Sequence, residues 1–209
     1  MEMLIRGERP KIQSYRPPAA GFNQKEKPKM MRNVGDMRAI ANAEAQDWTY
    51  FDGSKRRLYY TDEAYELNNG VIIMLRTDPD GLILNGNQAF VDASGYSPPQ
   101  LRGRPMALLR HPHMPRAVFR EMWDTLEQGR EWNGAIKNLR RDGSYYWAMT
   151  HIVPDINENN EIVHFIGTQR KMVVGAIRRQ EALYAEMRER EQSAPSKSPA
   201  LDFFKLRLF

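Results

Sequence analysis

The fold is decided by one continuous stretch, Arg110–Trp147, which reads RHPHMPRAVFREMWDTLEQGREWNGAIKNLRRDGSYYW. Within it, Val118, Met122 and Leu126 recur at the spacing that places side chains on one face of a helix. Gly129 follows the last of them, and glycine readily takes the left-handed conformation found just after helix ends. The first half of the stretch therefore predicts one amphipathic helix that ends at this glycine.

The second half of the stretch predicts a β-hairpin. Side chains over residues 132–137 alternate with the period of a strand. The segment Arg141–Ser144 contains an Asp-Gly pair, which tolerates the positive φ of a tight hairpin turn. Tyr145–Val153 is then the returning strand.

Shorter segments on either side extend this pattern to an α+β fold. Three further strands are expected, at Val71–Arg76, Leu82–Leu84 and Ile162–Arg170. Short helices are expected at Gln88–Ala93, from Pro98 to Gly103, and in the acidic run that begins at Thr61. The sum is a five-stranded antiparallel sheet with short helices on one face, which leaves a concave pocket between the sheet and the helices.

The two ends of the chain read as extensions of a domain at 61–172. Residues 1–60 are interrupted by prolines and include one expected short helix at Met37–Ala45. The aromatic cluster that follows packs either on this domain, as a cap over its sheet, or on a partner. A helix is expected over 173–192 and a flexible tail over 193–209. That helix either carries a signal outward or folds back on the sheet.

Composition excludes several classes of function. The 209 residues include no cysteine, which removes disulfides and thiol catalysis. No apolar run approaches the ~20 residues of a membrane helix, and the first residues lack a secretory stretch, so a cytoplasmic protein is expected. The net charge of +5 comes without a nucleic-acid motif, so nucleic acid is not an expected partner. Motifs for nucleophilic catalysis and for nucleotide phosphates are missing, so we expect neither an enzyme nor a metal site.

Several short motifs of the central stretch recur in order in one known family. They are Arg-His-Pro-x-Met-Pro at 110–115, Met-Trp at 122–123, Glu-Trp at 131–132, Lys-Asn at 137–138 and Asp-Gly-x-x-Tyr-Trp at 142–147. The stretch resembles the PAS domain of bacterial aerotaxis and energy-taxis receptors, and the resemblance extends from about Val71 to Met172. Those domains hold FAD non-covalently. The resemblance therefore implies a PAS fold and a sensor that binds FAD and reports redox or oxygen state.

Two amide side chains are the first candidates for contact with a flavin. Asn138 matches flavin-binding PAS domains of both the aerotaxis and the LOV kind, and Gln169 lies in a Gly-x-Gln segment that resembles LOV domains. An amide offers donors and an acceptor, so it can answer a protonation change at the ring by rotating. The alternative for each is an amide at the edge of the core that pairs with backbone. Without cysteine, the flavin-adduct chemistry of LOV photoreceptors is excluded.

Five further residues are candidates for the same site: Arg110, His111, Trp132, Trp123 and Asn87. Arg110 and His111 resemble family residues needed for FAD binding, and a guanidinium also suits a pyrophosphate. The two tryptophans could form the walls of a ring site or pack as ordinary core residues.

Other interpretations remain open beside FAD. FMN could replace it, and haem is a minority alternative because His111 lies in the region from which PAS haem sensors take a ligand. A cofactor-free PAS adaptor, or an assembly subunit of a larger complex, is the alternative from another class. A protein partner is expected in either case, and a homodimer is compatible with the C-terminal helix.

Overall fold

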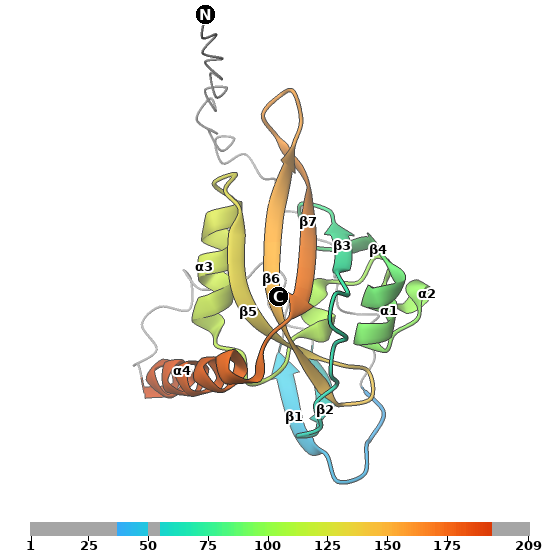
Figure 1. The fold of residues 1–209 in the computed structure, drawn as a ribbon, viewed down its shortest axis with the longest axis vertical. Helices are drawn as coiled ribbons and strands as arrows, with labels where there is room; N and C mark the ends of the chain where they lie inside the picture. The colour runs from blue at the N-terminus through green and yellow to red at the C-terminus, as the bar shows by residue number, and fades with distance from the viewer. Residues whose placement is uncertain (1–36, 50–54, 194–209) are drawn as a thin grey trace, which may run out of the picture.

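The computed structural model describes residues 37–49 and 55–193. The expected five-stranded antiparallel sheet is confirmed, with the spatial order β4-β3-β7-β6-β5 (Figure 1). Its strands are β3 (Ile73–Thr77), β4 (Ile83–Gly86), β5 (Trp132–Leu139), β6 (Tyr145–Ile156) and β7 (Ile162–Lys171). The helical segments are α1 (Gln88–Ser94), α2 (Pro98–Leu101), η1 (Met106–Leu109), α3 (Arg116–Leu126) and α4 (Val174–Ser193). A separate hairpin is formed by β1 (Glu44–Thr49) and β2 (Lys55–Tyr60).

The register of the strands defines one face of the sheet, which we call the inner face. Directly opposite residues point to the same side, and Gln169 of β7 lies opposite Thr150 of β6 and Ile73 of β3. Gly167, two residues earlier in β7, lies opposite Ile152 of β6. Because side chains alternate along a strand, these residues share the inner face and their sequence neighbours point the other way.

The helices between β4 and β5 cover the inner face. Helix α3 packs against β5 and β6, and α1 packs against β3 (Figure 1). The apolar side of α3 is fully buried, through Val118, Phe119, Met122, Trp123 and Leu126. Gly129 has a φ of 71° just after this helix, as the sequence predicts.

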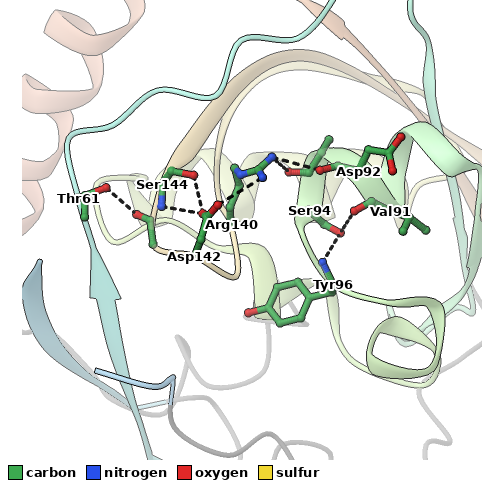
Figure 2. A network of polar contacts seen from close by, with 10 residues as sticks. Thr61, Val91, Asp92, Ser94, Tyr96, Arg140, Asp142 and Ser144 are labelled. Atoms are coloured by element: carbon green, nitrogen blue, oxygen red, sulfur yellow. Dashed lines mark hydrogen bonds and ion pairs between the residues drawn. The ribbon is translucent and has the colours of Figure 1, made fainter. Parts of the chain in front are cut away.

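One arginine ties the turn of the β5–β6 hairpin to helix α1. Arg140 donates to the backbone oxygens of Asp92 and Ala93 near the end of α1, and it pairs with Asp142 in the turn (Figure 2). Gly143 has a φ of 86° in that turn, so the predicted Asp-Gly turn is confirmed. The guanidinium satisfies carbonyls that a helix end leaves without intrahelical partners.

Helix α4 folds back on the β5 edge of the sheet, next to α3, and leaves much of the outer face exposed. The hydroxyl of Tyr184 donates to the backbone oxygen of Ala135 at 2.7 Å, and the indole N–H of Trp147 donates to Glu181 at 3.2 Å. Tyr184 is buried against the ring of Trp147. Of the two arrangements that the sequence allows for this helix, the structure shows the folded-back one. No helix within the described ranges is both long enough and apolar enough to cross a membrane.

The β1–β2 hairpin packs on its own domain. Leu58 of β2 is buried in a cluster with Leu139 at the end of β5. Arg56, also buried, donates to the backbone oxygen of Leu108 and to the hydroxyl of Tyr96. The described part of the N-terminal extension is therefore a cap. Residues 1–36 and 194–209 of the expected extension and tail lie outside the described residues.

Two expected helices are wrong. Met37–Ala45 is not helical, since Asn42 has a φ of 60° and β1 begins at Glu44, where it pairs with β2. The acidic run from Thr61 is extended, because it pairs with the start of β6: Tyr65 donates its N–H to the backbone oxygen of Tyr145. In both segments strand pairing overrides the local helix preference: with the neighbouring strand β2 in the first, and with the distant start of β6 in the second.

Candidate ligand cavity on the inner face

A small cavity lies between the inner face of the sheet and the helices. Its volume is about 20 Å³, and its lining includes Thr150, Phe165 and Gln169 from the sheet and Met106 and Trp123 from the helices. A volume of this size holds roughly one water molecule, whereas pockets for drug-sized ligands span about 300–1,000 Å³. A cofactor could enter only if the side chains contributed by η1 and α3 withdraw.

Polar groups gather on the sheet side of this cavity. Gln169 is 1% exposed, and its Oε1 accepts a hydrogen bond of 3.1 Å from the hydroxyl of Tyr146. Thr150, directly opposite Gln169, has a buried hydroxyl without a hydrogen-bond partner among the described residues. Such orphan groups are rare in cores because their burial costs about 1–3 kcal/mol. A buried hydroxyl that lines a cavity is therefore suited to meet a ligand or an ordered water.

Asn138 lies close to this group but does not line the cavity. It is directly opposite Tyr146 in the β5–β6 pair, and its buried Nδ2 lacks a hydrogen-bond partner among the described residues. Tyr146 thus lies beside Asn138 and bonds Gln169. Whether Asn138 and Gln169 contact a ligand stays a prediction, and the structure brings both amides to the same tyrosine.

Of the two predicted tryptophans, only Trp123 lines the cavity. Its ring packs edge-on against Phe165, with 5.4 Å between ring centroids. Trp132 lies on the inner face, where its ring covers Gly134, the residue opposite Thr150. The indole N–H of Trp132 donates to Glu121 of α3, which fixes the ring against the helix.

Asn87 is used by the fold rather than by the cavity. Its side-chain oxygen accepts from the backbone N–H groups of Phe90 and Met74, and its Nδ2 donates to the backbone oxygen of Ile72. The residue caps α1 and ties that helix to the segment leading into β3. It does not line the cavity.

The backbone of Arg110 forms a β-bridge with Asn138, while the side chains of Arg110 and His111 lie away from the cavity, beneath the β1–β2 hairpin. The guanidinium of Arg110 lies 4.9 Å from the ring centroid of Trp48 and 4.5 Å from that of Phe119. A cation held between two aromatic faces is stabilised by their quadrupoles. Contact between Arg110 and the phosphates of a ligand would require Trp48 of the hairpin to move aside.

His111 is fully buried in a cluster of rings. Its Nδ1 accepts from the backbone N–H of His113, and its Nε2 has no hydrogen-bond partner among the described residues. The rings of His113, Tyr60 and Tyr145 pack around it edge-on, with centroids 4.7–5.7 Å away. Burial, reinforced by the nearby charge of Lys137, lowers the pKa of His111 to about 2. This histidine is therefore neutral at physiological pH.

Burial also shifts the pKa values of the titratable groups around His111. Burial lowers the pKa of Lys137 and of His113, and burial together with the hydrogen bond to Glu44 raises the pKa of Tyr60 to about 12. The ammonium group of Lys137 lies 3.7 Å from the ring centroid of Tyr145. The groups around His111 thus form a poorly solvated junction between the hairpin, the outer face and the start of α3.

Two residues of the cavity region are not among the site residues predicted from the sequence. Thr150 and Tyr146 lie on β6 at positions of the same parity as Ile152, so strand alternation alone could have placed them on the inner face. Their relation to Gln169 depends on the register between β6 and β7, which a single sequence does not reveal.

A second, larger pocket of about 410 Å³ lies at the other end of the inner face, between β4 and the helices α1 and α2. Its lining is mainly apolar, with Arg102 and Asn85 among its polar members. None of the candidate site residues lines it.

Comparison with known proteins identifies the fold. Residues 83–169 match the family model described as "PAS fold". This match covers β4 through most of β7, which includes the helices over the cavity and all of its lining except Leu75 and Thr77 of β3. The domain therefore has the PAS fold, as the sequence motifs imply.

Curated relatives cover about half of this chain. The chain is 39% identical over 100 residues to the aerotaxis receptor of Escherichia coli (strain K12). The aligned region spans 48% of this chain and 20% of the receptor. It is 38% identical over 98 residues to the nitrogen fixation regulatory protein of Klebsiella oxytoca, and 29% identical over 108 residues to phototropin-2 of Oryza sativa subsp. japonica. The matched region spans only 20% and 12% of those two proteins.

Solved structures of similar shape include light-oxygen-voltage and PAS domains. One, from a study of a flavin analogue in a light-oxygen-voltage domain, has 23% identity and a TM-score of 0.47, and the alignment covers 57% of this chain and 87% of that one. The PAS domain of a protein from Colwellia psychrerythraea has 30% identity and a TM-score of 0.45, with 48% and 86% covered.

Proposed function

We propose that this protein is a non-enzymatic sensory PAS domain that binds FAD between the sheet and α3 and reports redox state to a protein partner. The observation that carries the proposal is the polar set on an otherwise apolar face: Gln169 and the orphan hydroxyl of Thr150 line the cavity, and the orphan amide of Asn138 lies nearby. The motifs shared with aerotaxis receptors and the similarity to that family point to FAD as the cofactor.

The residues fit the polar edge of a flavin, while the cavity volume fits it only after rearrangement. A bound flavin would supply a ring edge whose protonation changes on reduction. Amide and hydroxyl groups can each donate or accept, so Gln169 and Thr150 can pair with either form. Room for the ring would come from Trp123, Leu126 and Met106, which close the cavity on the helix side.

A route from the cavity to α4 is built into α3. Pro115 precedes α3 and supplies no side-chain cap, and the carboxylate of Glu191 near the end of α4 takes that role. Its two oxygens accept from the backbone N–H groups of Arg116 and Ala117 at 3.1 and 2.7 Å. If a bound ring displaces α3, the hydrogen bonds between Glu191 and the start of α3 would change. The position of α4 would then change with them and could be detected by the partner.

An absorption spectrum of the purified full chain tests the proposal. We expect the bands of oxidised flavin, bleached by dithionite, and release of FAD on denaturation. If the protein is colourless as purified, it should retain FAD through gel filtration after incubation with the cofactor, and the flavin absorption band of the retained FAD should differ from that of free FAD. Absence of both signals would remove the flavin from the proposal.

The cavity volume favours a second candidate, a PAS domain without cofactor that acts as an adaptor. A space of about 20 Å³ closed by Trp123 and Phe165 is close to a packed core. This candidate predicts that neither FAD nor FMN binds, and that the thermal midpoint is unchanged by either flavin. A cofactor that binds only the folded state raises that midpoint, so the same titration separates the two candidates.

Replacing Thr150 by valine should stabilise the flavin-free protein and weaken flavin binding. The hydroxyl of Thr150 has no partner among the described residues, so an isosteric methyl removes a desolvation cost of about 1 kcal/mol. The same change deletes a polar group from the cavity lining. Urea unfolding of the flavin-free protein and a flavin titration measure the two effects.

The matched control for Thr150→Val is Thr168→Val, a threonine of the adjacent strand that lies opposite His151 on the outer face. The control should not raise the unfolding midpoint, and it should leave the flavin affinity unchanged. A loss of stability in Thr150→Val comparable to that of an ordinary buried hydrogen bond would show that the hydroxyl is satisfied in solution.

A further inference from the structure

Tyr146 is enclosed on the inner face near the start of β6, and its hydroxyl forms one hydrogen bond there. The residue is 1% exposed, and its hydroxyl lies 3.1 Å from Oε1 of Gln169, which is equally buried. Across the β5–β6 pair it lies directly opposite Asn138. Tyr146 thus lies opposite one amide residue in the sheet, and its hydroxyl is bonded to the other.

The hydroxyl of Tyr146 acts as a donor. Complete burial raises its pKa above the ordinary value, so the phenol keeps its proton at neutral pH. That one proton is directed to the side-chain oxygen of Gln169. The oxygen and the NH₂ group of a carboxamide are bonded to the same carbon and point in different directions within one plane. With its oxygen held by Tyr146, Gln169 therefore directs its NH₂ group away from that hydroxyl.

We propose that Tyr146 is a positioning residue: through this hydrogen bond it presets the carboxamide of Gln169, so that the cavity offers an N–H donor and selects a ligand edge that carries an acceptor. The geometry of the donor, the amide and the cavity lining carries this inference. Applied to a flavin, this inference rests on the proposed function. It then predicts that the site binds the oxidised flavin more tightly than the reduced one.

The preference follows from the protonation change at the ring edge. An oxidised ring presents acceptors, which match the donor that Gln169 offers, whereas reduction adds a proton there. Gln169 could then pair only by turning its oxygen toward the ligand, which breaks its bond with the hydroxyl of Tyr146. The hydrogen bond therefore opposes reduction, and its loss should make reduction easier.

Tyr146→Phe in the full chain, without flavin, is the first test. The side-chain carbonyl carbon of Gln169, assigned by its disappearance in Gln169→Leu, should move upfield in the NMR spectrum when the hydroxyl is removed. Tyr145→Phe is the matched control, because this neighbour carries the same hydroxyl on the opposite face and should leave that resonance in place. An unchanged Gln169 resonance in Tyr146→Phe would overturn the proposal.

The unchanged chain gives a second readout, which does not depend on the variant folding. A hydroxyl proton held in a buried hydrogen bond should exchange slowly and show a cross-peak to Gln169. A rapidly exchanging hydroxyl at neutral pH would contradict the assignment.

The flavin-loaded protein gives the functional readout. In Tyr146→Phe the ratio of reduced to oxidised flavin at a fixed potential should rise about tenfold, which is about 30 mV for a two-electron couple. A midpoint potential that stays the same or falls would overturn the role of Tyr146. If no flavin binds at all, the proposed function fails, and the NMR measurement on the flavin-free chain still decides the role of Tyr146.

Discussion

Between pH 7.5 and pH 4.5 the protein should lose about 2.5 kcal/mol of stability through His111 alone. This histidine titrates with a pKa of about 2 in the folded state, against an ordinary value of 6.5. In that interval the unfolded chain takes up a proton at this position and the folded chain does not, so stability falls as pH falls. The loss at pH 4.5 is set by the unfolded value, because the folded histidine remains neutral there.

Burial is the main reason why His111 stays neutral in the folded state, and the neighbouring positive groups reinforce it. Lys137 lies behind the histidine on β5, His113 packs beside it, and Arg188 of α4 adds a third positive group. The carboxylates in the neighbourhood, Glu44 and Asp62, act on His113 rather than on His111. No charge that could compensate an imidazolium is therefore placed against His111 by the groups that shift its pKa.

His111→Asn isolates this contribution. An asparagine oxygen can replace Nδ1 as the acceptor for the backbone N–H of His113 and does not titrate. Urea unfolding at pH 7.5 and pH 4.5 should show a stability loss that is about 2.5 kcal/mol smaller in the variant than in the parent. The smaller side chain will lower stability at both pH values, so the difference between them is the quantity to compare.

The control for this measurement is His151→Asn, which removes a histidine that stays in contact with solvent on β6. We expect the parent and this control to lose stability in parallel on acidification. Equal losses in His111→Asn and in the parent would mean that the buried ring gains a proton in the folded state, and that the junction beneath the hairpin is open to water.

Local periodicity was enough to predict the elements around the cavity. Val118, Met122 and Leu126 recur at helical spacing and are all buried on α3, and the Asp-Gly pair forms the turn it favours. Each of these signals is contained within a dozen residues. The strands flanking the turn follow from alternation in the same way.

Tertiary pairing overrode local preference outside this region. Thr61 and the acidic residues after it favour a helix, but their backbone pairs with the start of β6 some 80 residues later. The alanine-rich segment 37–45 likewise gives way to β1, whose partner β2 lies beyond it in the chain. The first outcome depends on a strand that no local window contains, and the second on a hairpin partner that the helix preference of residues 37–45 does not reveal.

The sequence predicted the kinds of residues at the candidate site better than it predicted where they lie relative to one another. Strand alternation places Gln169 on the inner face, and the structure adds the two β6 residues beside it, Thr150 and Tyr146. Arg110 and His111 belong to the motif at 110–115 that directly precedes α3. Their side chains nevertheless lie beneath the β1–β2 hairpin rather than in the cavity. The volume of the cavity depends on how Trp123 and its neighbours fill the space, which a residue pattern does not encode.

Glu191→Ala should loosen both α4 and the start of α3. The carboxylate of Glu191 accepts two backbone N–H groups that Pro115 leaves without a side-chain cap, and its charge also favours the positive end of the helix dipole. Removing such a cap costs about 1–2 kcal/mol, so the first-turn amides of α3 should exchange with solvent roughly tenfold faster. Alanine itself favours helix, so α4 keeps its local preference.

Hydrogen exchange at the amides of Arg116 and Ala117 measures this effect directly. Glu189→Ala is the matched control, since this exposed glutamate lies on the same helix two residues earlier. Exchange at both amides as slow as in the parent would show that α4 is not held against α3 in solution. The route from the cavity to α4 would then have no physical contact to travel through.

The same variant tests whether the cavity and α4 are coupled. If a flavin enters by displacing Trp123 and Leu126, it must move α3 against the contact with Glu191, and that contact opposes binding. By thermodynamic reciprocity, removing the contact should tighten flavin binding by up to the same factor of about ten. Flavin affinity that is unchanged while the α3 amides exchange faster would show that α4 docks on α3 without sensing the cavity, and the signal would have to leave the domain by another surface.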